Sequence, residues 1–308
     1  MSLPVGRLNL TLHLLYYFIM STINYKNISI EGVNIFYREA GNPNHPTILL
    51  LHGFPSSSHM YRDLITDLCD RFHLIAPDYP GFGSSDMPSR DHYEYTFDNL
   101  STTIEKFIDA LKLKHFNLYM QDYGAPVGYR IAVRRPELIQ SLLIQNANAY
   151  EEGLGPAIED GKRFWATRNE ETENTMRQIL TLEGTMMQYL DGVKDKKKIS
   201  PDAYHYDQYF LERPGNKEIQ LDLLYDYKNN IKQYPVWQNY LRTHQPPALI
   251  TWGKNDALFT DKGALAYQRD LPNAEIHLLN TGHFALEEFH SRIAAYIDEF
   301  LKRKSRGK

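Results

Sequence analysis

The chain has 308 residues, of which 42% are hydrophobic and 23% charged, and its formal net charge at pH 7 is -4. This composition is typical of a globular protein with a substantial core, and it argues against a repeat array or a disordered chain. The small negative charge argues against strong electrostatic binding to nucleic acid or an anionic membrane. The single cysteine, Cys69, cannot form a disulfide within the chain, so we expect a cytoplasmic protein.

The first twenty residues differ in character from the rest of the chain. Residues 8–20 form an apolar run, LNLTLHLLYYFIM, which follows the single basic residue Arg7. The run is too short to span a bilayer, and it lacks the small-residue cleavage site of a signal peptide. The sequence from Met20 onward reads like an ordinary start. We therefore interpret residues 1–20 as an upstream extension outside the fold, with a signal or membrane segment as the alternative.

Short apolar or β-branched runs recur along the chain and predict eight strands. The first two form a hairpin around Glu31 and Gly32. Residues 102–111 place apolar side chains at the spacing of an amphipathic helix, and residues 264–271 and 293–301 read similarly. Strands that alternate with helices predict an α/β fold with a mostly parallel sheet and helices on both faces. The predicted strands are 28–30, 33–38, 47–51, 73–76, 116–120, 142–145, 248–252 and 275–279.

The alternation stops at about residue 150 and resumes after His244, at Pro246 and Pro247. The segment between carries aromatic, acidic and helix-forming residues without a strong strand pattern. We therefore predict a core domain formed by residues 21–149 and 245–308, with residues 150–244 as a helical cap inserted into it. The basic run KDKKK within this insertion is expected to be a solvated loop.

Three chemically capable residues follow three of the predicted strands. Asp122 occupies a sharp turn between a strand and a helix, Asp256 follows a later strand, and His283 follows the last. Ligands of such sheets bind at the carboxyl ends of the strands, where these side chains converge. Each has a structural alternative, because aspartate also caps helices and forms turns, and a lone histidine is often structural. Their order along the chain is nucleophile, acid and histidine.

The chain carries the motifs HGFP at 52–55, DYPGFGSSD at 78–86, QDYGA at 121–125, WGKND at 252–256 and TGHF at 281–284. Together these motifs resemble the α/β-hydrolase superfamily over nearly all of residues 25–301. The nucleophile position, usually serine, carries Asp122, which is similar to the epoxide hydrolase and haloalkane dehalogenase branch. The resemblance implies that the carboxylate attacks carbon to form an alkyl-enzyme ester, and that His283, oriented by Asp256, activates the water that hydrolyses it. It also implies that the backbone N–H groups of Phe54 and Tyr123 form the oxyanion hole.

Two reactions of this branch need different donors. An epoxide hydrolase typically has two tyrosines in the insertion, and Tyr206 and Tyr227 occupy similar contexts, although any of the 22 tyrosines could simply be packing. A haloalkane dehalogenase commonly has tryptophan directly after the nucleophile. Here that residue is Tyr123, which leaves Trp165 in the insertion as a possible halide donor. Gln121 stands where both groups usually carry histidine.

The prediction is an epoxide hydrolase that uses an aspartate nucleophile, with a haloalkane or haloacid dehalogenase as the alternative. An alternative of another class is a ligand-binding protein of this fold without catalysis, which the complete set of three residues argues against. We expect no cofactor and no metal. The expected partners are a small, largely apolar organic substrate and water, without nucleic acid or membrane. Nothing in the sequence predicts the oligomeric state.

Overall fold

The computed structural model describes residues 22–306. Residues 1–21 and 307–308 lie outside this range, and so does the segment 1–20 that we interpret as an upstream extension. None of the helices within the described range has the length and apolar character needed to cross a membrane.

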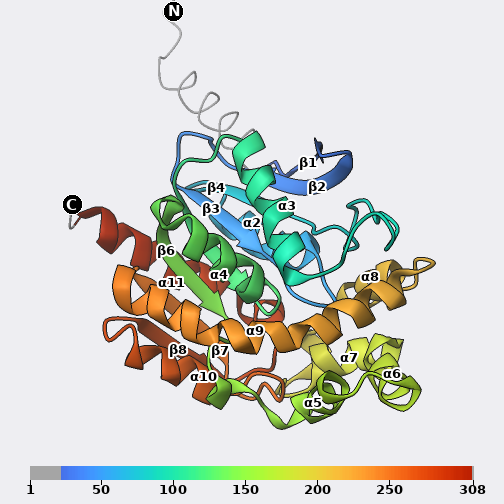
Figure 1. Ribbon diagram of the computed structural model, residues 1–308. Coiled ribbons are helices and arrows are strands. Elements are labelled where there is room, and N and C mark those ends of the chain that lie inside the picture. Colours follow the sequence, from blue (N-terminus) through green and yellow to red (C-terminus); the bar gives the residue numbers. More distant parts are fainter. Residues whose placement is uncertain (1–21, 307–308) are drawn as a thin grey trace, which may run out of the picture.

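A single sheet of eight strands forms the centre of the molecule (Figure 1). The strand order is β1-β2-β4-β3-β5-β6-β7-β8. Strand β2 runs antiparallel to its neighbours β1 and β4, and the other neighbouring strands pair in parallel. The predicted eight-stranded, mostly parallel sheet is therefore confirmed. The strands are β1 (Asn24–Ile30), β2 (Val33–Ala40), β3 (Thr47–Leu51), β4 (His73–Pro77), β5 (Phe116–Gln121), β6 (Ile139–Gln145), β7 (Ala248–Gly253) and β8 (Glu275–Leu279).

The central strands are covered on both faces. Leu49 and Leu51 of β3 face one hydrophobic cluster, whereas Ile48 and Leu50 of the same strand face the other. Because both faces are buried, such strands read as continuous apolar runs, which made them easy to recognise in the sequence. Strand β1 lies at the edge with its first four residues exposed, and pairing with β2 alone extends it to Asn24. Its predicted start was four residues too late for that reason.

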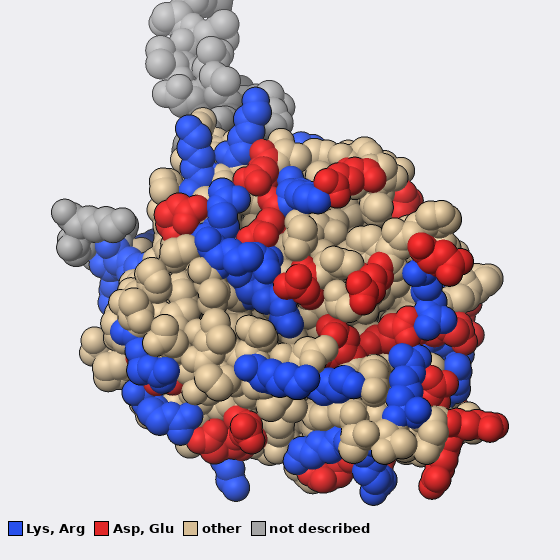
Figure 2. Space-filling view, viewed as in Figure 1, with Lys and Arg blue, Asp and Glu red and all other residues tan. Residues whose placement is uncertain are grey.

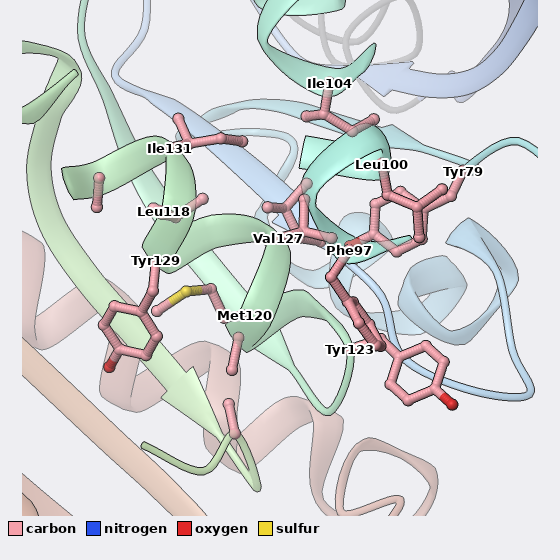
Figure 3. Close-up of a cluster of buried hydrophobic side chains, with 14 of the residues drawn as sticks. Tyr79, Phe97, Leu100, Ile104, Leu118, Met120, Tyr123, Val127, Tyr129 and Ile131 are labelled. Carbon is pink, nitrogen blue, oxygen red and sulfur yellow. The ribbon is translucent and has the colours of Figure 1, made fainter. Parts of the chain in front are cut away.

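Helices α3 and α4 pack on one face of the sheet, and α2 and α11 on the other (Figure 1). Figure 3 shows part of the first cluster, where side chains of α3, α4 and β5 meet. Helix α3 begins five residues before the predicted residue 102, because the side chain of Thr96 caps it by accepting from the N–H of Asn99. The core helices are α2 (Arg62–Leu68), α3 (Phe97–Ala110), α4 (Gly124–Arg134), α10 (Asp261–Ala266) and α11 (Leu286–Arg306).

Residues 150–244 are all described and contain no strand of the sheet. They form α5 (Glu159–Ala166), α6 (Glu170–Arg177), α7 (Leu182–Leu190), α8 (Pro201–Leu211) and α9 (Asn216–His244). The 29-residue α9 also packs on the core, where Trp237 stacks on Tyr129 of α4 with ring centroids 5.3 Å apart. Short 3-10 turns lie at Ser58–Tyr61, Pro136–Leu138, Glu151–Gly153, Pro156–Ile158, Gln178–Leu180, Lys196–Lys198 and Tyr267–Arg269.

Charged side chains of both signs are interspersed on the face shown in Figure 2. Many of them form ion pairs across short distances, such as Arg134 with Glu105 at 3.0 Å. The basic run at residues 194–198 is exposed, as expected for a solvated segment. This face of the molecule therefore presents no broad basic surface of the kind that nucleic acid binding requires.

Candidate active site

Asp122 lies on a tight turn between the end of β5 and the start of α4. Its φ is +48°, in the left-handed region that residues other than glycine rarely adopt. Gly124 permits this turn, because a Cβ there would lie 2.2 Å from the carbonyl oxygen of Leu51. Gly53 leaves room for the carboxylate, since a Cβ at that position would lie 2.3 Å from the Cβ of Asp122. Strained geometry of this kind is typical of a nucleophile held at the edge of the sheet.

The carboxylate of Asp122 is buried and held by backbone donors. The N–H of Phe54 donates to Oδ1 at 2.7 Å, and the N–H of Tyr123 also hydrogen-bonds to the carboxylate. The structure thus brings both expected oxyanion donors to Asp122. Burial raises the pKa of this carboxyl to about 6, although the nearby His283 and the two N–H donors oppose the shift. At pH 7 the group is still mostly ionised and available as a nucleophile.

His283 and Asp256 form a buried pair beside Asp122. Nδ1 of His283 lies 2.7 Å from Oδ2 of Asp256, and Nε2 lies 3.8 Å from Oδ2 of Asp122. Asn146 orients Asp256 by donating to its Oδ2 at 2.8 Å, and the N–H of Leu258 donates to its Oδ1 at 2.8 Å. Burial lowers the pKa of His283, but the two carboxylates outweigh this effect and leave the pKa above its usual value.

His52, the other histidine near the oxyanion loop, is fully buried and stacks on Tyr79 with ring centroids 4.1 Å apart. Its Nε2 accepts a hydrogen bond from the N–H of Tyr79. Burial lowers its pKa to about 3, so the ring stays neutral at physiological pH. These contacts indicate a structural role for His52, because both ring nitrogens are hydrogen-bonded to backbone groups, those of Gly53 and Tyr79.

A cavity of about 320 Å³ opens next to Asp122. Its wall combines core residues with residues of the helical insertion, and most of them are apolar. This size suits a small organic molecule rather than a polymer. Within residues 22–306, no three His, Cys, Asp or Glu side chains are grouped so as to hold a metal ion. The lining consists of Phe54, Asp122, Tyr123, Ala157, Ile158, Asp160, Gly161, Trp165, Thr175, Met176, Ile179, Met187, Gln188, Leu224, Tyr227, Leu258 and Phe259.

The expected leaving-group donors occupy different environments. Tyr123 lines the cavity, and its buried hydroxyl has no partner among the described residues. Tyr227 also lines the cavity, with its hydroxyl hydrogen-bonded to Tyr234. The indole N–H of Trp165 donates to the carbonyl of Leu224 at 2.7 Å. Trp165 therefore reaches the cavity with its ring, while its only donor is already engaged.

Tyr206 lies outside the cavity wall. Its ring stacks on His59 of the core turn Ser58–Tyr61, with centroids 4.2 Å apart. The helix turns the neighbouring Asp207 inward, where it is buried, and this leaves Tyr206 on a partly exposed face. Its position gives no support to the expected role as a leaving-group donor, because Tyr206 is not part of the wall of the cavity beside Asp122.

The sequence did not single out two polar residues that the structure brings to the site. Asn146 directly follows β6, so the rule that placed Asp122 and His283 at strand ends would also have found it. Gln188 lines the cavity from α7, and its amide nitrogen is buried without a partner among the described residues. No sequence signal marks Gln188, since its orientation depends on how α7 packs.

The family model described as the α/β-hydrolase fold matches residues 46–289. The chain is 43% identical over 279 residues to Uncharacterized hydrolase YNR064C of Saccharomyces cerevisiae, covering 88% of this chain and 93% of that protein. It is 24% identical over 292 residues to Epoxide hydrolase 2 of Caenorhabditis elegans, covering 92% and 81% of the two chains. The crystal structure of the haloalkane dehalogenase DatA from Agrobacterium tumefaciens C58 matches with a TM-score of 0.77 at 24% identity, covering 91% and 97%.

The protein therefore belongs to the α/β-hydrolase family, as the sequence motifs indicated. The extent of these matches, together with the fold, makes it a hydrolase. The structural match to DatA lies below 25% identity and shows the common fold.

Proposed function

We propose that the protein is an epoxide hydrolase in which Asp122 attacks a ring carbon of the substrate. The observation that carries this proposal is the arrangement of Asp122, which lines the cavity with Oδ1 held by the N–H of Phe54 and Oδ2 3.8 Å from Nε2 of His283. Oδ2 forms the new O–C bond as the C–O bond of the ring breaks. The product is an ester of Asp122 whose carbonyl oxygen lies in the oxyanion hole.

The second step hydrolyses this ester. Water gives one proton to Nε2 of His283, and the resulting hydroxide attacks the carbonyl carbon of Asp122. The tetrahedral intermediate then releases the diol, and the proton on His283 passes to the departing alkoxide oxygen. The proton left on the Asp122 carboxyl returns to the phenolate that had protonated the opened ring, so that every group regains its starting state. Asp256 supports this cycle because its carboxylate accepts from Nδ1–H of His283 and stabilises the positive ring.

Two hydroxyl groups at the cavity favour an epoxide as the substrate. The opening ring develops a basic oxygen that needs a proton, and Tyr123 and Tyr227 both reach the cavity. Burial raises the pKa of both phenols well above the usual value, so both are neutral hydrogen-bond donors at pH 7, and each gives up its proton only as the negative charge on the opening oxygen develops. The similarity to a protein named Epoxide hydrolase 2 supports the same reaction. We assign residues 150–244 the role of a cap, since they supply much of the cavity wall.

A single-turnover experiment in H2(18)O tests the proposal. With enzyme in excess over an epoxide, the diol should carry only ordinary oxygen, because its new oxygen comes from Oδ2 of Asp122. The heavy oxygen should instead enter the peptide that contains Asp122, as measured by mass spectrometry. If the label appeared in the diol, water would have attacked the epoxide directly, and Asp122 would not be the nucleophile.

One observation favours haloalkane dehalogenation as a second candidate. The Tyr123 hydroxyl and the Gln188 amide nitrogen are both unpartnered among the described residues, and both belong to the cavity wall. A departing halide is a weak base that needs stationary hydrogen-bond donors rather than a proton. Solved haloalkane dehalogenases share the fold. Release of bromide from bromoalkanes, without diol from any epoxide in the panel, would favour this second reaction over the first.

A further inference from the structure

Gln121 makes an unusual contact with the catalytic histidine. Its amide nitrogen lies 2.9 Å from Nε2 of His283, the ring nitrogen that must take a proton from water in the proposed reaction. By comparison, Oδ2 of Asp122 lies 3.8 Å from the same nitrogen, beyond hydrogen-bond distance. Gln121 is fully buried at the end of β5, directly before the nucleophile. In the enzyme without substrate, the amide of Gln121 is therefore the hydrogen-bond partner of Nε2 of His283, the proposed general base.

The other end of this amide is free. Oε1 of Gln121 is buried and has no hydrogen-bond partner among the described residues. It lies beside Gly53, where a Cβ would approach it to 2.3 Å. A half-turn about the last side-chain bond exchanges nitrogen and oxygen, and it breaks no second hydrogen bond, because the outer atom has none. The side chain can thus present either a donor or an acceptor to His283.

The proposed reaction creates a need for both. Neutral His283 donates from Nδ1 to Asp256 and accepts at Nε2, where an amide N–H is the suitable partner. After His283 takes a proton from water, Nε2 becomes a donor and requires an acceptor. The carboxylates of Asp122 and Asp256 both raise the pKa of His283 in the resting enzyme. Once Asp122 has become an uncharged ester, only Asp256 of these two still has this effect. A carbonyl oxygen next to Nε2 would stabilise the imidazolium by a charge-assisted hydrogen bond.

We propose that Gln121 is a positioning residue whose amide donates to neutral His283 in the resting enzyme, gives up this contact to the attacking water, and turns to accept from protonated His283 during ester hydrolysis. This inference rests on the function proposed above. Because a hydrogen bond to a charged group is roughly twice as strong as a neutral one, Gln121 favours the protonated ring overall. The side chain thereby replaces part of the stabilisation that Asp122 loses when it becomes an ester.

The test measures the titration of His283 directly by NMR, with the His283→Gln variant used to assign its signal among the 12 histidines. The Asp122→Asn background mimics the uncharged ester. In that background, Gln121→Met should lower the pKa of His283 by about one unit, since it removes the acceptor of the charged ring. An unchanged or raised pKa would overturn the proposal, because it would mean that Gln121 acts only as a donor to the neutral ring or not at all.

Two further variants keep the result interpretable. Gln121→Glu has nearly the same shape and places a negative charge beside Nε2, so it should raise the pKa of His283 if residue 121 contacts the ring, and a lower value would count against that contact and the proposal built on it. Gln145→Met is a matched control, since Gln145 ends the neighbouring strand, is fully buried and contacts the backbone carbonyl of His283 instead of its ring. It should leave the pKa of His283 unchanged.

Turnover adds a readout that distinguishes this inference from the proposed function. In Gln121→Met, loss of the ester adduct should slow about tenfold, in line with a pKa change of one unit, while its formation changes little. Equal slowing of both steps would contradict the assignment. If the wild type formed no adduct with any substrate, the proposed function would fail, whereas the titration would still decide the role of Gln121.

Discussion

Nε2 of His283 lies 3.8 Å from Oδ2 of Asp122, while its Nδ1 is hydrogen-bonded to Asp256 at 2.7 Å. The imidazole of His283 is thus hydrogen-bonded to Asp256 but not to Asp122. This difference separates two tasks, because the untied Asp122 can attack carbon while His283 is reserved for the water that follows. Both residues are buried. Because their tasks differ, replacing Asp122 should block the attack on carbon, whereas replacing His283 should block hydrolysis of the ester.

Asp122→Asn should abolish turnover while the fold is retained. The amide has nearly the same shape as the carboxylate but is a poor nucleophile, so kcat should fall by about a thousandfold or more. Activity on epoxides, with circular dichroism as the control for folding, measures this. Slow recovery of activity on storage would indicate deamidation back to aspartate, which intact mass would reveal. Undiminished activity in a freshly prepared sample of verified mass would show that another group attacks.

His283→Gln should permit attack but block hydrolysis, because the water loses its general base while Asp122 remains. An ester adduct should accumulate, and intact-protein mass should rise by the mass of the whole epoxide. A bromoalkane would instead add the alkyl group without bromine. Absence of any substrate-sized increase, with substrates that the wild type turns over, would contradict either the two-step scheme or the role of His283.

Tyr123→Phe and Tyr227→Phe should reduce diol formation by about a hundredfold each, because the opening epoxide loses a proton donor at the cavity. Tyr206→Phe is the matched control, since this tyrosine lies outside the cavity wall and should leave activity within about twofold of the wild type. Diol formation is measured on a panel of small epoxides. A loss of diol formation in Tyr206→Phe, but not in the other two variants, would show that Tyr206 and not Tyr123 or Tyr227 protonates the opening epoxide.

The pH dependence of kcat/KM should show an acidic limb close to pH 6. The pKa of Asp122 is raised to about 6 by burial, and only the ionised carboxylate can attack. Activity should therefore decline as pH falls through this value and level off above it. Initial rates between pH 4.5 and about 8, on a substrate that does not itself titrate, provide the measurement. A profile that stayed flat down to pH 4.5 would show that no group with a pKa near 6 controls the attack, which would contradict the raised pKa of Asp122.

Asp207 offers a separate prediction about stability. This buried residue of α8 accepts hydrogen bonds from Tyr189 and from Ser56, which lies two residues after Phe54 in the segment that follows β3. Burial raises the pKa of Asp207 to about 7. A folded-state pKa above the unfolded value contributes stability that is complete at low pH and lost as pH rises through about 7. Asp207→Asn does not titrate, and its amide can still pair with the two hydroxyls.

The gain in stability of Asp207→Asn over the wild type should therefore be larger at pH 8 than at pH 4.5, by about 3 kcal/mol at most. Urea unfolding of both proteins at the two pH values measures the difference. A gain that is the same at both values would show that Asp207 keeps its ordinary pKa in the folded protein. Because the comparison is between two proteins at each pH, the titration of other groups largely cancels.

The sheet and the three reactive residues could be predicted from local patterns. Buried parallel strands read as short apolar runs, and the residues that follow them must converge at one edge of the sheet. Asp122, Asp256 and His283 each follow a strand, so their strand-end positions brought them together in the structure as the motifs indicated. The exposed start of β1 was missed because only hydrogen bonding to β2, without any apolar alternation, defines it.

Only the tertiary structure decided which side chains face the cavity. Tyr206 and Tyr227 look alike in sequence, yet the packing of α8 places the first against His59, away from the cavity, and that of α9 places the second in the cavity wall. Aromatic residues surround these helices on many sides, so no periodicity marks the face that meets the substrate. The contact of Gln121 with His283 joins residues 162 positions apart. Such a contact depends on side-chain directions set by packing across the whole sheet, which no local sequence pattern records.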